Sequence, residues 1–79
     1  MRKSISILGS TGSIGLSTLK IIDKKKSNFN INILAANKNL SLIVQQIKKY
    51  KPKIFIVSNK IIYNKIKKRF KKKKIKIFN

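Results

Sequence analysis

The chain has 79 residues, enough for one hydrophobic core, either of a small domain or of part of a larger one. It contains no cysteine and no histidine, which excludes disulfides, thiolate metal sites and nitrogen-ligated zinc. No apolar run is long enough for a signal-peptide core or a membrane-spanning helix, so we expect a cytoplasmic protein that does not contact a membrane.

The charge is strongly unbalanced, because 19 lysines and 2 arginines stand against a single acid, Asp23, giving a formal net charge of +20. A charge of this size is typical of proteins that bind polyanions. The lysines are nevertheless spread over every predicted element, together with abundant isoleucine and asparagine, as in a coding sequence that drifts toward A and T. We therefore interpret them as solvated surface residues and keep a small basic, nonspecific nucleic-acid-binding protein as the alternative.

The first half of the chain predicts a strand, a helix and a second strand. Residues 3–8 alternate and are rich in isoleucine, which predicts a buried strand that runs into a glycine turn. From Ser13 to about Lys26 the apolar period is that of a helix, with Thr18, Leu19 and Ile22 on one face. The basic segment 24–28 ends this helix. Residues 29–36 alternate again and predict the second strand.

The second half repeats this pattern. A second helix is predicted by one apolar stripe, with Asn39 as its N-cap and Pro52 as its stop; the stripe is Leu40, Ile43, Val44, Ile47 and Tyr50. Residues 53–58 contain a short apolar run, 54–57, typical of parallel strands covered on both faces. A third helix is marked by Ile62, Ile66 and Phe70, and residues 74–79 predict the beginning of a fourth strand.

The order β-α-β-α-β-α-β predicts an α/β fold, the first half of a Rossmann-type doubly wound parallel sheet. A complete sheet of this type has further strands and helices, so we interpret residues 1–79 as a truncated part of a domain. Aromatic residues, namely Tyr50, Phe55, Tyr63 and Phe70, are expected in core or half-buried positions, not on a base-stacking surface. The sequence leaves the place of the fourth strand in the sheet open.

One motif carries specific chemistry, and it lies between the first strand and the first helix: Gly9-Ser10-Thr11-Gly12-Ser13-Ile14-Gly15. Glycines let the backbone turn tightly and approach a pyrophosphate, and the following helix offers free N–H groups and the positive end of its dipole. The serine and threonine hydroxyls add donors. The structural alternative is that the glycines only make a close turn between strand and helix.

A phosphate-transfer P-loop does not fit this turn, because its pattern requires a lysine near the end of the turn and Leu16-Ser17-Thr18 supplies none. The end of the second strand then distinguishes between nicotinamide cofactors. NAD-binding domains usually place an acid there to hold the ribose hydroxyls, whereas this chain has Asn37-Lys38-Asn39. A cation with amide donors suits a 2′-phosphate, so the sequence favours NADPH. The alternative is that Lys38 belongs to the general excess of lysine in this chain and has no role in binding.

These residues carry a resemblance that runs through most of the chain. Ile7-Leu8 with the glycine turn, then Ser17-Thr18-Leu19, Ala35-Ala36-Asn37-Lys38-Asn39 and a helix carrying Gln46, resemble the N-terminal part of the 1-deoxy-D-xylulose 5-phosphate reductoisomerase family. Members are NADPH-dependent, metal-dependent oxidoreductases of the non-mevalonate route of isoprene biosynthesis. The resemblance implies that Thr11, Gly12, Ser13 and Ile14 contact the pyrophosphate side of the cofactor, and that Asn37, Lys38 and Asn39 contact its 2′-phosphate side.

We identify no catalytic residue and no metal ligand in the chain. Reduction of a carbonyl needs a Lewis acid or general acid beside the cofactor, and a hard cation needs several oxygen ligands. The single carboxylate, Asp23, is expected on the solvent side of the first helix. The resemblance implies that a divalent metal, Mg or Mn, a phosphorylated sugar substrate and a homodimer interface involve catalytic and C-terminal domains absent from these 79 residues, so we expect the isolated chain to be inactive.

Overall fold

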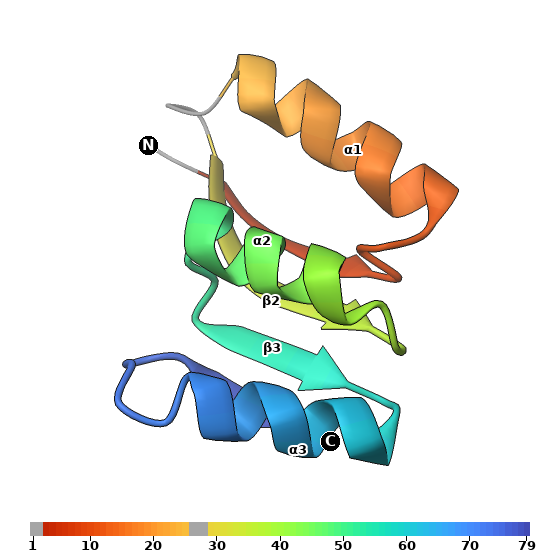
Figure 1. The fold of residues 1–79 in the computed structure, drawn as a ribbon. Helices are drawn as coiled ribbons and strands as arrows, with labels where there is room; N and C mark the ends of the chain where they lie inside the picture. Colours follow the sequence, from red (N-terminus) through yellow and green to blue (C-terminus); the bar gives the residue numbers. More distant parts are fainter. Residues whose placement is uncertain (1–2, 26–28) are drawn as a thin grey trace.

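The computed structural model describes residues 3–25 and 29–79 as alternating strands and helices (Figure 1). The four strands are β1 (Lys3–Leu8), β2 (Phe29–Ala36), β3 (Ile54–Val57) and β4 (Lys76–Phe78). The three helices are α1 (Ser13–Lys24), α2 (Leu40–Tyr50) and α3 (Lys60–Arg69). All three strand pairs are parallel. The predicted α/β order is therefore confirmed.

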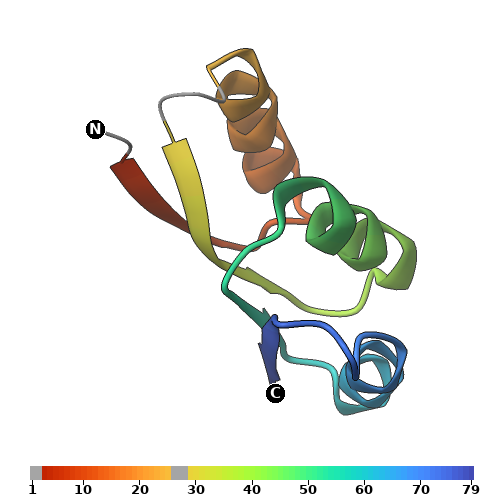
Figure 2. The same cartoon turned by 90° about the vertical axis from the view of Figure 1, so that its left-hand side faces the viewer.

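The strands lie in the sheet in the order β1-β2-β3-β4, so each crossover steps one place in the same direction. Crossovers of one hand that step in one direction place their helices on the same face of a sheet. Figure 2 shows α1, α2 and α3 together on one side of the strands. The described residues thus form one winding of a Rossmann-type sheet, and the question of the fourth strand is answered: it pairs with β3.

The core lies between this helix-covered face and the helices. Strand residues at alternating positions are buried there, including Leu34, Phe55 and Val57, which are fully inaccessible. Ile43 of α2 and Ile66 of α3 are also fully buried. Tyr50 and Tyr63 are half-buried at the margin of this core, as the sequence predicts. Apolar burial of this kind supplies most of the stabilisation of a small domain.

The opposite face of the sheet carries one apolar row, which no described element covers. Leu8, Ala35, Ile56 and Phe78 align across the four strands in register. Leu8 is 79% exposed and Phe78 is 50% exposed. The expectation that both faces around β3 are covered is therefore wrong for residues 3–25 and 29–79. All three crossovers step in the same direction along the sheet, which places their helices on one face. Helices are placed on the second face only where the direction of the strand order reverses.

The ends of the elements differ slightly from those predicted. The first helix ends at Lys24 with Lys25 as its C-cap, and the predicted extension to Lys26, like the break at 26–28, lies outside the described residues. The third and fourth strands are shorter than predicted, although the flanking residues Lys53 and Ser58 still make backbone hydrogen bonds to Lys76 and Ala36. The predicted N-cap is confirmed, since the Asn39 side chain accepts a hydrogen bond from the Leu42 N–H at 3.2 Å.

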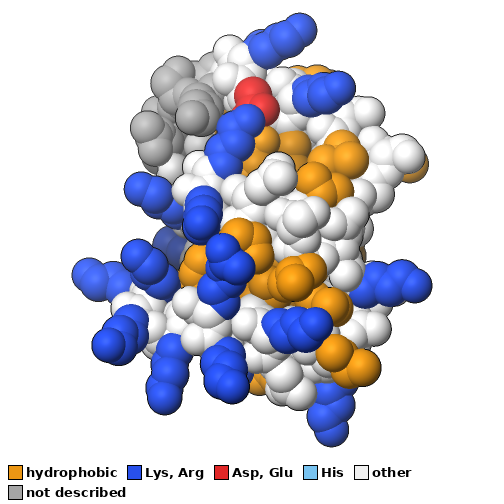
Figure 3. All heavy atoms as spheres, in the orientation of Figure 1, with side chains coloured by type: hydrophobic (Ala, Val, Ile, Leu, Met, Phe, Trp, Pro, Cys, Tyr) orange, Lys and Arg blue, Asp and Glu red, His pale blue; other side chains and the backbone are white. Residues whose placement is uncertain are grey.

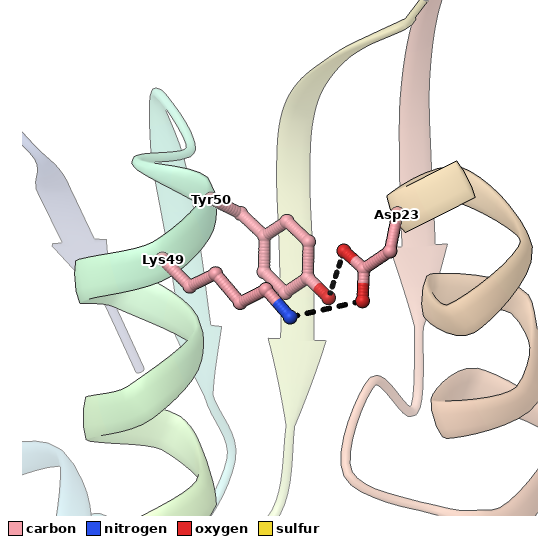
Figure 4. Close-up of polar contacts among 3 residues, drawn as sticks. All are labelled: Asp23, Lys49 and Tyr50. Carbon is pink, nitrogen blue, oxygen red and sulfur yellow. Dashed lines mark hydrogen bonds and ion pairs between the residues drawn. The ribbon is translucent and has the colours of Figure 1, made fainter. Parts of the chain in front are cut away.

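Asp23 joins two helices and is not simply a solvent-facing residue, which corrects the expectation for it. Its carboxylate accepts a hydrogen bond from Lys49 Nζ at 2.9 Å and another from the Tyr50 hydroxyl at 2.9 Å (Figure 4). Both partners come from the last turn of α2, and the Asp23 side chain is only 29% exposed. The contact fixes the end of α1 against the end of α2.

Burial, together with the hydrogen bond to Asp23, raises the pKa of Tyr50 above its ordinary value of 10.0. The hydrogen bond to the same carboxylate raises the pKa of Lys49 above 10.5. In both cases the folded chain holds the proton more tightly than the unfolded chain. This contribution to stability is complete below the unfolded pKa values and is lost as the pH rises through the folded ones.

We therefore expect Tyr50→Phe to lower the free energy of unfolding by about 1 kcal/mol at pH 7, because one hydrogen bond to a carboxylate is lost. The difference from the parent chain should shrink above pH 10, where the parent also loses the contact. Urea unfolding followed by circular dichroism at pH 7 and pH 11 measures it. Tyr63→Phe is the control, since the Tyr63 hydroxyl contacts Lys67 at an exposed position. An equal loss in both variants, or a difference independent of pH, would contradict the assignment.

Candidate functional site

The candidate site lies at the edge of the sheet where the strands end. Because the strands are parallel, the turn after β1 and the loops after β2 and β3 all lie at this carboxyl edge (Figure 1). Each of these connections leads into the N-terminus of a helix, with Gly12, Asn39 and Asn59 as the N-caps. None of the three helices has an acidic residue in its first turn. The edge therefore presents three positive dipole ends, which favour an anionic ligand.

The glycine turn is held in place by the neighbouring strand. The N–H groups of Gly9 and Ser10 both donate to the Ala35 carbonyl oxygen of β2, at 2.7 and 2.9 Å. Gly9 has a positive φ of 77°, which L side chains rarely adopt. A Cβ on Gly15 would come within 2.8 Å of Ser10 Cα and closer still to the Gly9 carbonyl oxygen. Glycine at position 15 therefore allows the first turn of α1 to pack directly against the glycine turn.

The three helix N-termini differ in how they are capped. Asn39 caps α2, and Asn59 caps α3 by accepting from the Ile62 N–H at 3.1 Å. The N-cap of α1 is Gly12, which has no side-chain acceptor. The first N–H groups of α1 are therefore the ones left for an external acceptor, as in helix N-termini that bind phosphate.

The side chains of the glycine turn divide into two groups. Ser10 is fully buried, so its hydroxyl faces the interior and not a ligand on the surface. Thr11 is half-buried, and Gly12 and Ser13 are exposed. Ile14 is 84% exposed, which is unusual for a large apolar residue beside a glycine turn. Of the three hydroxyls expected as donors, those of Thr11 and Ser13 are thus placed to contribute, whereas the Ser10 hydroxyl is not.

The loop Asn37-Lys38-Asn39 is exposed and lies beside the loop that follows β3. The Ser58 hydroxyl donates to Asn37 Oδ1 at 2.9 Å, and the Asn59 N–H donates to the Asn37 carbonyl oxygen at 3.1 Å. Asn39 Oδ1 caps α2. Both amide oxygens are thus used within the protein, and the Asn37 and Asn39 NH₂ groups remain as donors beside the Lys38 ammonium. This donor set fits a phosphate.

Three residues at this edge were not predicted as part of the site. Ser58 and Asn59 hold the Asn37 loop, and Gln46 of α2 donates from Nε2 to the Ser10 carbonyl oxygen at 2.8 Å. Two signals in the sequence could have identified them. Ser58-Asn59 directly follows a buried strand, and Gln46 is a polar residue in the apolar stripe between Ile43 and Ile47.

The described part of the chain gives no candidate for a metal site or a membrane span. Among residues 3–25 and 29–79 there is no group of three or more His, Cys, Asp or Glu side chains that could hold a metal ion. Within the same residues, no helix combines the length and the apolar character needed to cross a bilayer.

The lysines gather mainly at the other edge of the sheet. On the face shown in Figure 3 they crowd the side where α2 and α3 end, and a cavity of about 440 Å³ there has an apolar floor with lysines around it. The lysines that line this cavity are Lys48, Lys51, Lys53, Lys73 and Lys74. The strongest concentration of charge is thus separate from the glycine turn.

The chain matches the family model described as 1-deoxy-D-xylulose 5-phosphate reductoisomerase over residues 5–79. It is 47% identical over 74 residues to the reductoisomerase of Buchnera aphidicola (subsp. Schizaphis graminum), covering 94% of this chain and 19% of that protein. It is 43% identical to the Pelagibacter ubique protein, covering 98% and 20%. Hence it spans about a fifth of the length of these relatives.

Solved structures show the same arrangement of elements. The reductoisomerase from Zymomonas mobilis in complex with NADPH matches 99% of this chain and 21% of its own, with a TM-score of 0.89 at 26% identity. A structure of the enzyme in complex with NADPH, fosmidomycin and magnesium matches with a TM-score of 0.88 at 24% identity. The fold predicted from the sequence is thus confirmed, and it is shared with about a fifth of the reductoisomerase chain.

The geometry of the turn distinguishes its glycines. We expect Gly15→Ala to destabilise the chain by about 2 kcal/mol or more, because the new methyl group meets backbone atoms that cannot yield. Gly12→Ala should cost no more than about 1 kcal/mol, since a Cβ there lies in ordinary contact, 3.5 Å from the Gly9 carbonyl oxygen, and only a helix cap is weakened. Thermal unfolding of the two variants measures this order. The reverse order would show that the turn adopts another conformation.

Proposed function

The chain belongs to the 1-deoxy-D-xylulose 5-phosphate reductoisomerase family, and we propose that it forms the part of such an enzyme that binds NADPH. The observation that carries the proposal is the uncapped N-terminus of α1 directly after the glycine turn. It provides free backbone donors at the carboxyl edge of a parallel sheet, where dinucleotides bind in folds of this type.

In this proposal, the two ends of the site bind different phosphates. The turn from Gly9 to Gly15 faces the pyrophosphate, with N–H groups of the turn and of the first turn of α1 as donors. The side chains of Thr11 and Ser13 add hydroxyls, and Ile14 covers the nucleotide with an apolar surface. Asn37, Lys38 and Asn39 hold the 2′-phosphate, and the lack of an acid at the end of β2 removes the repulsion that would disfavour it.

We propose that the complete protein carries out the family's reaction, the NADPH-dependent reductive isomerisation of 1-deoxy-D-xylulose 5-phosphate to 2-C-methyl-D-erythritol 4-phosphate. The cofactor supplies the hydride when bound, and the residues described here orient it. A divalent cation, Mg or Mn, needs oxygen ligands that the described residues do not group together. Those ligands, and the phosphorylated substrate's site, therefore belong to catalytic and C-terminal domains beyond these residues.

The open face of the sheet fits this assignment. Parallel sheets are normally covered on both faces, and the row from Leu8 to Phe78 is apolar and uncovered among the described residues. We propose that further parts of the reductoisomerase pack on this face. A homodimeric, cytoplasmic enzyme is the state that the family resemblance supports.

Nonspecific binding of nucleic acid remains the second candidate, because lysines surround the cavity at the far edge. It would use a different part of the molecule from the NADPH site. Substitutions at the two edges therefore separate the two functions.

We expect the chain to bind NADPH more tightly than NADH, with the preference depending on Lys38. Lys38→Gln should weaken NADPH binding about tenfold, since a charge-assisted contact to the 2′-phosphate is lost, and leave NADH binding unchanged. Titration calorimetry at fixed ionic strength measures both. Lys53→Gln is the matched control, because it removes the same charge at the far edge.

Gly12→Val should abolish the difference between the cofactors, because the side chain occupies the space that the pyrophosphate needs, while Gly12 itself tolerates a Cβ. Equal, weak binding of both cofactors that moderate salt removes would contradict the proposal. That result, with equal effects of Lys38→Gln and Lys53→Gln, would favour nonspecific polyanion binding.

A further inference from the structure

Gln46 is a buried polar residue that connects α2 to the glycine turn. It is 4% exposed and lies 36 positions further along the chain than its partner. Its Nε2 donates to the Ser10 carbonyl oxygen at 2.8 Å. The contact therefore reaches from the helix after β2 to the turn after β1, the part of the molecule proposed to hold the pyrophosphate.

This hydrogen bond fixes the orientation of one peptide group. The Ser10–Thr11 peptide is planar and trans, so its carbonyl and its N–H point in opposite directions. Because the Ser10 carbonyl is directed inward to Gln46, the Thr11 N–H is directed away from α2. The two preceding N–H groups, of Gly9 and Ser10, are already used by the Ala35 carbonyl oxygen. Thr11 is thus the first residue of the turn whose N–H can serve a ligand.

The hydrogen bond to Ser10 satisfies only part of the polar groups buried around Gln46. Gln46 Oε1 and Ser10 Oγ are both buried and have no hydrogen-bond partner among the described residues. The free-energy cost of burying a polar atom without a partner offsets much of the stabilisation that a hydrogen bond contributes. An apolar residue would continue the stripe of Ile43 and Ile47 but would leave the buried Ser10 carbonyl oxygen without a donor, so the glutamine is what holds this carbonyl.

We propose that Gln46 is a positioning residue for cofactor binding, which holds the Ser10–Thr11 peptide so that the Thr11 N–H faces the pyrophosphate. The proposal rests on the proposed function, since it assigns the turn to the pyrophosphate. It concerns only that end of the site, because Gln46 donates to Ser10, whereas the Asn37 loop that would hold the 2′-phosphate is bonded to Ser58.

The test compares Gln46→Met with Gln45→Met. Methionine keeps the length of the side chain and removes the donor, and Gln45 is the exposed neighbour on the same helix. We expect Gln46→Met to weaken NADPH binding about tenfold, equivalent to the loss of one well-placed donor. Binding of adenosine 2′-monophosphate, which lacks the pyrophosphate, should stay unchanged. Gln45→Met should alter neither.

Two further measurements separate positioning from general damage to the fold. The amide resonance of Thr11 should shift on NADPH addition in the parent chain and lose most of that shift in Gln46→Met. Gln46→Glu should bind weakly at pH 8 and recover at acidic pH, because a protonated carboxyl can again donate to the Ser10 carbonyl oxygen.

The outcomes distinguish this proposal from the proposed function. If the parent chain binds NADPH and Gln46→Met binds it equally well, the positioning role is wrong and the NADPH site stands. Equal weakening for NADPH and adenosine 2′-monophosphate would show a purely structural role, which also overturns the proposal. If the parent chain binds neither ligand, the proposed function fails, and the positioning role fails with it.

Discussion

The candidate site depends on one close contact between backbones, that of the first turn of α1 with the glycine turn. Only glycine at position 15 allows it, because a Cβ there would collide with main-chain atoms of Gly9 and Ser10. The contact brings the uncapped end of the helix next to a turn whose first two N–H groups are held by Ala35. The free donors that follow are therefore fixed before any ligand arrives, and a preorganised donor loses little freedom on binding.

The arrangement of the strands brings the other parts of the site next to the glycine turn. Because the strands are parallel, the helices begin at one edge, and because β2 and β3 are adjacent, Asn37 and Ser58 become neighbours across their loops. The order of the strands leaves the second face of the sheet uncovered in the described residues, with Leu8 and Phe78 exposed. The parallel direction of the strands thus explains the convergence of polar groups at the edge, and their order explains the apolar face beside it.

Local patterns were sufficient to predict the order of elements and the glycine turn. Period-2 and period-3.6 spacing, Asn39 as a cap and Pro52 as a stop are all readable within a few residues. Contacts between distant parts of the chain were not readable in this way. The hydrogen bonds of Asp23 to α2, the bond from Gln46 to Ser10 and the burial of the Ser10 hydroxyl depend on how α1 and α2 pack. The uncovered face followed from strand order, which composition and spacing left open.

The large positive charge has little to do with how the turn would hold a phosphate. The donors there are backbone N–H groups and a helix dipole, whose strength does not depend on the number of lysines elsewhere. The densest group of lysines lies at the far edge, around Lys51 and Lys74. Charges separated by more than about 8 Å in solvent are largely screened at physiological salt. A sequence can therefore accumulate lysines over most of its surface while the proposed pyrophosphate end of the site keeps its geometry, because glycines and one buried glutamine determine that geometry.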